Sequence, residues 1–163
     1  MIKLLIGSPA WVRIFTLVVL GAALSFLMTA SVTKAQRKAA EDDSSVLHDY
    51  RGIQLGMLSD EVRKKLGDPK DKSDEQDFFV FNDTETAQVV YDKTHKVITI
   101  SADFLTQGTG IPTAKQVFGA EVEAKADGSV YKMVRFPKAG YWLSYNRTSG
   151  TSPLTTVTLQ KIQ

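Results

Sequence analysis

A very short helix with signals at both ends is the feature that most constrains how this chain folds. It lies in the segment YRGIQLGMLSDEVRKKLGDPKD, residues 50–71. Three apolar side chains share one face of this helix: Leu58, Val62 and Leu66. Ser59 is a suitable N-cap, Gly67 is suited to the position after the last turn, and Pro69 prevents continuation. Because two helical turns are marginal alone in water, we expect capping and packing to hold this helix in place.

Strand-like segments follow this helix, and the same order then recurs. The first three strands are expected at residues 78–81, 87–91 and 96–100. A second short helix is expected near residues 111–118 and ends at Gly119, as the first ends at Gly67. Three further strands are expected at the following ranges: 129–136, 140–145 and 154–162. One such unit is too small to bury a good core, so the two units are expected to share one.

The predicted fold class is therefore α+β. We expect two tandem units, residues 50–101 and 102–163, each made of one short helix plus three antiparallel strands. The strands of both units would form one sheet, with both helices on one face. Residues 50–163 would then be a single domain.

The N-terminal part of the chain differs from the rest in composition. Residues 1–35 combine basic residues, an uncharged apolar run and a small-residue exit, which is typical of a signal peptide. An uncleaved membrane anchor is the alternative, because the apolar run approaches the length that spans a bilayer. Residues 36–49 read as a polar tether. Either interpretation predicts export, to the periplasm or to the outer side of the inner membrane. Membrane contact is expected only through residues 1–35, and only if they are not cleaved.

Composition excludes several function classes. The chain has no cysteine, which excludes disulfides, zinc–thiolate sites and a cysteine nucleophile. The formal net charge is +2, but three bases and no acids precede Gln36. The remainder holds 17 bases and 18 acids, which does not favour nucleic acid as a partner. Residues 102–163 hold 7 bases and 4 acids, which we interpret as solvated surface, with a polarised binding face as the alternative.

We find no residue pattern that predicts catalysis, a cofactor or a metal site. His48 and His95 have no second histidine at helical spacing and are expected to be exposed. Four acids lie close together but lack the order of a calcium loop, and we expect a solvated loop: Asp71, Asp74, Glu75 and Asp77. The chain is therefore predicted not to be an enzyme.

The first helix and its flanks resemble the BamE-like (SmpA/OmlA) families. The residues that carry the resemblance are Gly52, Gly56, Met57, Val62, Leu66, Gly67 and Pro69. The doubled order of helix and strands is similar to the larger group that includes β-lactamase inhibitor proteins. The resemblance implies an exported envelope domain that works by binding proteins, in outer-membrane assembly or envelope maintenance.

Aromatic residues suggest where such binding occurs. Alternation along a strand places Tyr141, Leu143 and Tyr145 on one face and Trp142 on the other. Phe78 and Val80 are the expected companions of Trp142, and these three residues are our predicted partner-binding surface. The alternatives are that these side chains pack under loops or in a dimer, or that Trp142 faces the helices.

The leading hypothesis is a non-enzymatic, exported binding module of the bacterial envelope. The alternative is a proteinaceous inhibitor of a periplasmic or secreted hydrolase, which the tandem order and the aromatic face would suit. A third hypothesis, a small hydrolase or ligand-binding protein, would need a deep pocket lined by convergent polar groups.

Overall fold

The computed structural model describes residues 47–163. The predicted signal peptide or anchor, and the tether before Leu47, lie outside the described residues. Within residues 47–163, no helix is both long and apolar enough to cross a membrane.

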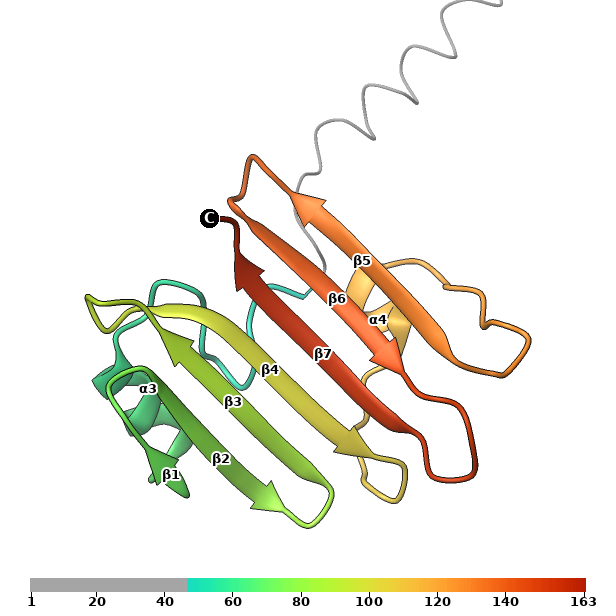
Figure 1. Cartoon of the computed structure of the whole chain (residues 1–163), viewed down its shortest axis with the longest axis horizontal. Helices are drawn as coiled ribbons and strands as arrows, with labels where there is room; N and C mark the ends of the chain where they lie inside the picture. The colour runs from blue at the N-terminus through green and yellow to red at the C-terminus, as the bar shows by residue number, and fades with distance from the viewer. Residues whose placement is uncertain (1–46) are drawn as a thin grey trace, which may run out of the picture. The chain divides into compact units, whose positions relative to one another are not determined.

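One antiparallel sheet of seven strands is the main element of the described chain (Figure 1). The elements in chain order are α3 (Ser59–Leu66), β1 (Asp71–Lys72), β2 (Gln76–Asn82), β3 (Glu85–Tyr91), β4 (Val97–Leu105), α4 (Ala114–Phe118), β5 (Val130–Phe136), β6 (Tyr141–Arg147) and β7 (Leu154–Lys161). The strand order across the sheet is β1-β2-β3-β4-β7-β6-β5. The last strand in sequence, β7, therefore pairs with β4 and moves β5 to the outer edge.

The predicted α+β fold class is wrong. The structure is mostly β, a single seven-stranded sheet with two minor helices, rather than two tandem units of a helix plus three strands. The helices span 8 and 5 residues, and their buried apolar side chains are Val62 in α3 and Val117 in α4. Helices this short bury little surface, so the strands supply most of the core. The expected boundary at residue 101 also falls inside β4, which continues to Leu105.

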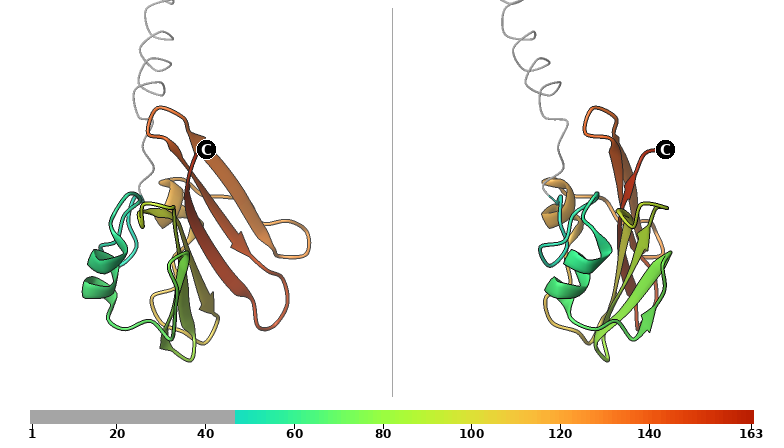
Figure 2. Two further views of the ribbon diagram at one scale, coloured as in Figure 1. Left: turned by 60° about the vertical axis from the view of Figure 1, so that its left-hand side comes forward. Right: turned by 90° about the vertical axis from the view of Figure 1, so that its left-hand side faces the viewer.

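The core lies on one face of the sheet. The register aligns two buried rows across four adjacent strands: Val89, Ile100, Leu159 and Leu143, and then Ala87, Ala102, Val157 and Tyr145. Both short helices and the segment from residue 47 to 57 lie on one side of the sheet (Figure 2). The intervening row on the opposite face is polar: Gln88, Ser101, Thr158 and Ser144. The sheet thus has a covered apolar face and an open polar face.

The start of α3 differs from the prediction. Leu58, rather than Ser59, is the N-cap, and Ser59 is buried within the helix. The reason is a pairing with the two residues just before β4: the Ser59 amide donates to the His95 carbonyl at 2.9 Å, and Leu58 forms a β-bridge with Lys96. The Glu61 carboxylate accepts from the Leu58 amide at 3.1 Å and satisfies one free donor of the first turn. Leu58 is therefore exposed, and Val62 is the helix residue in the core.

The two helix-ending glycines behave as expected from the sequence. Gly67 has φ 87° and Gly119 has φ 72°, values that side chains disfavour. The second helix begins with a capping box, in which the Thr113 hydroxyl accepts from the Gln116 amide at 3.2 Å. Caps therefore delimit both helices, even though the helices do not define repeated units.

Replacing Val62 tests the packing of α3. We expect Val62→Ala to lower the free energy of unfolding by about 2 kcal/mol, because the side chain is fully buried and leaves a cavity. Lys64→Ala, at an exposed position of the same helix, should change it by less than about 0.5 kcal/mol. Urea denaturation measures both values, and equal effects would contradict the placement of α3.

Candidate functional site

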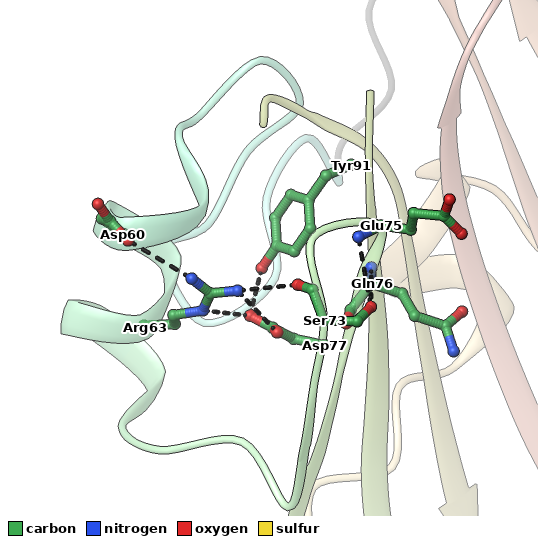
Figure 3. Close-up of polar contacts among 7 residues, drawn as sticks. All are labelled: Asp60, Arg63, Ser73, Glu75, Gln76, Asp77 and Tyr91. Carbon is green, nitrogen blue, oxygen red and sulfur yellow. Dashed lines mark hydrogen bonds and ion pairs between the residues drawn. The ribbon is translucent and has the colours of Figure 1, made fainter. Parts of the chain in front are cut away.

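A buried ion pair fastens α3 to the sheet. Asp77, on the core face of β2, is fully buried. The Arg63 guanidinium donates from Nε to Oδ2 of Asp77 at 2.8 Å and from Nη2 to Oδ1 at 3.0 Å. The Tyr91 hydroxyl donates to the same Oδ2 at 2.7 Å (Figure 3). Two N–H donors and one O–H donor thus satisfy a charge that would otherwise be costly to bury.

The protonation states of Arg63 and Tyr91 are fixed near neutral pH. The hydrogen bond to Asp77 raises the pKa of Arg63 above its usual range. Burial, and then the hydrogen bond to Asp77, raises the pKa of the Tyr91 phenol well above its ordinary value. Arg63 therefore stays charged and Tyr91 stays a neutral donor. This arrangement is suited to holding α3 in place rather than to proton transfer.

The sequence interpretation of the acidic cluster is corrected at Asp77. Asp74 and Glu75 are exposed between β1 and β2, as expected of a solvated loop, whereas Asp71 is exposed in β1 and Asp77 is buried and paired. The alternation of side chains along β2 could have indicated this burial, because Asp77 lies two residues before the buried Phe79 and therefore on the same face. Among residues 47–163 no group of histidine and acidic side chains is arranged to hold a metal ion.

A cavity of about 340 Å³ lies on the covered face, and its walls include Leu47, residues 49–51, Gly110 and Pro112. Apolar side chains from β4 and β7 line much of it: Ile100, Ala102, Phe104, Val157 and Leu159. Glu85 lies at its wall and accepts from the Tyr50 hydroxyl at 2.7 Å and from Arg51 Nη2 at 2.6 Å. Arg51 also stacks 4.1 Å from the centre of the Phe81 ring. The polar side chains of Tyr50, Arg51 and Glu85 thus bind one another at the wall of the cavity.

The charge state of Glu85 is set by these neighbours. The hydrogen bond from Arg51 lowers the pKa of the Glu85 carboxyl, burial opposes this, and the hydrogen bond from Tyr50 reinforces it. Burial, followed by the bond to Glu85, raises the pKa of Tyr50 well above its ordinary value. Glu85 is therefore a carboxylate and Tyr50 a neutral donor near neutral pH. Through this cluster, residues 50–51 are joined to β3.

The predicted partner-binding residues lie on the open face but not together. Trp142 and Phe78 are half-buried, and Val80 is 43% exposed. Trp142 is on β6, opposite Arg135 and Gln160, whereas Phe78 and Val80 are on β2. Three strands separate β2 from β6, so the distance is roughly 19 Å at about 4.8 Å per strand spacing. The structure therefore does not bring Trp142 next to its expected companions.

Two exposed residues that the sequence analysis missed lie on β5, the strand that pairs with the strand of Trp142. Tyr131 is 54% exposed and Met133 is 49% exposed, both on the open face of β5. The register places Met133 opposite Ser144, one diagonal step from Trp142. Alternation along residues 129–136 could have assigned their face, but their exposure depends on the position of β5 at the sheet edge. We name Tyr131, Met133 and Trp142 the edge patch.

The residues that carry the resemblance to the BamE-like families lie in α3 and in the turns on either side of it. Gly52 and Gly56 both have positive φ, and Met57 accepts from the Val97 amide through its carbonyl. Leu66 is partly buried against the core, and Pro69 is half-buried. His48 and His95 are exposed, as expected.

Comparison of the chain with known protein families, with curated proteins and with solved structures finds no match. The resemblance to the BamE-like families therefore stays a prediction, and the local geometry carries the functional argument.

Removing the buried carboxylate tests the role of the ion pair. We expect Asp77→Asn to lower the free energy of unfolding by about 3 kcal/mol, because Arg63 then remains partly buried without its counter-charge. Asp74→Asn, at an exposed position of the same acidic segment, should cost less than about 0.5 kcal/mol. Denaturant unfolding that gave similar losses for both would contradict a structural role for Asp77.

The Glu85 cluster predicts a specific pH dependence. Because the folded pKa of Glu85 lies below its unfolded value, its contribution is present above about pH 4.3 and is lost as the pH falls through the folded pKa. Glu85→Gln should therefore lower stability at neutral pH and flatten the decline of stability in acid. Arg51→Gln should flatten it as well, because it removes the strongest cause of the shift. Thermal unfolding from about pH 6 to 3 measures this, and an unchanged acid slope in both variants would contradict the account.

Proposed function

We propose that this protein is a non-enzymatic binding module of the bacterial envelope, exported by its N-terminal segment, and that it acts through protein–protein contacts. The observation that carries the proposal is the edge patch, in which Tyr131 and Met133 are about half exposed on β5 and Met133 is a diagonal neighbour of Trp142. Aromatic residues and methionine are enriched where proteins meet.

The surroundings of the edge patch support contact with a protein. The centre of the open face is polar and its side chains bind one another, as Ser101 and Thr158 do at 3.0 Å. Asp103 likewise accepts from Thr156 at 2.6 Å. An apolar patch bordered by polar surface is the usual arrangement of a protein interface.

The envelope location follows from the basic and apolar composition of residues 1–35 and from the BamE-like signature. In this role the covered face and its ion pair provide a stable scaffold, and the edge patch provides the contact. A role in outer-membrane assembly or envelope maintenance is the specific form of the proposal.

Capture from envelope extracts tests this function. We expect the tagged full-length chain to capture a protein, and the double variant Tyr131→Ser, Met133→Ser to reduce that capture by about tenfold or more, as truncation of hot-spot residues does. Val80→Ser is the matched control, because Val80 is similarly exposed at the far side of the same face. Capture that both variants leave unchanged would contradict the proposed surface. Turnover of a substrate by the pure chain would contradict the non-enzymatic role.

A further inference from the structure

The two edges of the sheet differ. At one edge, β1 has two residues, so it offers little backbone for pairing. At the other edge β5 has seven residues, and among the described strands it pairs with β6 alone. A long edge strand with unpaired backbone groups is a template for the addition of another strand.

The free backbone groups of β5 can be assigned from the ends of β6. The Gly140 carbonyl accepts from the Ile162 amide at 2.8 Å, and the Thr148 amide donates to the Leu154 carbonyl at 2.9 Å. Even-numbered residues of β6 therefore turn their backbone groups to β7, and odd-numbered residues turn theirs to β5. By the register, Lys132 and Val134 bond to β6, whereas Tyr131, Met133 and Arg135 turn their N–H and C=O groups to the free edge.

The side chains of β5 determine which kind of strand could pair with its free edge. Its charged residues are Lys132 and Arg135, and it contains no acid. Arg135 is exposed, and Lys132 lies over the Phe118 ring at 5.0 Å. Tyr131 and Met133 offer apolar contact on the open face. Opposite charges across a strand pair stabilise it, so a complementary strand has acids facing Lys132 and Arg135 and apolar residues elsewhere.

A second copy of the chain fits this edge less well. Two β5 strands joined edge to edge would bring four bases together without a single acid from either strand. Like charges along a shared sheet edge oppose pairing, and charged residues on an edge strand are a common device against self-association.

We propose that the free edge of β5 binds an extended, acidic segment of a partner protein by antiparallel strand addition. The inference rests on the proposed protein-binding function and specifies how that binding occurs. Main-chain hydrogen bonds to Tyr131, Met133 and Arg135 supply affinity, and the two bases supply selectivity.

A synthetic strand tests the proposal directly. The probe is a fluorescent seven-residue peptide of valine with glutamate at its second and fifth positions, which face Arg135 and Lys132 in the antiparallel register. We expect the full chain to bind it, and lysine in place of both glutamates to weaken binding by about tenfold. N-methylation at the fourth position, whose N–H would point to Met133, should abolish binding, and N-methylation at the third should not. Equal effects of the two N-methyl groups, or no preference for glutamate, would overturn the proposal.

Two variants of one residue separate backbone pairing from side-chain contact. Met133→Pro removes an N–H that faces the free edge, and proline is tolerated on that side of an edge strand. We expect it to weaken peptide binding by at least about tenfold, and Met133→Ala, which keeps the N–H, to weaken it by less than about threefold. Similar losses in both variants would overturn strand addition in favour of side-chain contact. If Met133→Pro does not fold, the N-methyl comparison decides the question on the unchanged chain.

The two proposals fail in different ways. Capture of an envelope protein that depends on the edge patch and is weakened equally by Met133→Ala and Met133→Pro would keep the proposed function and overturn strand addition. Peptide binding in the expected pattern, without any β5-dependent capture, would keep the strand-addition site and overturn the envelope function. Self-association that Met133→Pro abolishes, with no peptide binding, would identify a second copy as the occupant and overturn the acidic partner.

Discussion

The pairing of β4 with β7 is the constraint on which the rest of the structure depends. Residues 99–105 pair with residues 154–160, and side-chain bonds such as that between Ser101 and Thr158 reinforce the ladder. This pairing joins two groups of strands into one sheet and continues the core rows across it, Ile100 beside Leu159 and Ala102 beside Val157. Neither group alone would bury enough apolar surface for a stable fold. The same pairing also sends β5 to the outer edge, so stability and the exposed strand have a common cause.

The two faces of the sheet have separate roles. The covered face holds the apolar core, the Arg63–Asp77 pair and the Glu85 cluster, in which charged groups bind one another. Such pairs specify how α3 and residues 50–51 lie on the sheet more than they add net stability. The open face is polar at its centre and apolar beside β5, where Tyr131 and Met133 are exposed. A rigid scaffold that presents one free strand is suited to binding by preorganisation, since little order has to be created on contact.

Local pattern predicted the strands well and the architecture poorly. Alternation and β-branched content located six strands, because those signals come from neighbouring residues. The α+β fold class was wrong because the helix signals mark very short helices, of eight and five residues, so that the strands supply most of the core. Asp77 was misassigned because its partner Arg63 lies 14 residues away, on another element. The exposure of β5 could not be predicted, because it depends on the β4–β7 pairing between distant parts of the chain.

Amide hydrogen exchange along β5, measured by NMR on the full chain alone, tests the central claim most directly. The account predicts alternation: slow exchange at Lys132 and Val134, whose N–H groups bond to β6, and fast exchange at Tyr131, Met133 and Arg135. Uniformly slow exchange would contradict it, because the edge would then already be paired. Uniformly fast exchange would contradict it as well, because β5 would not be a strand of the sheet.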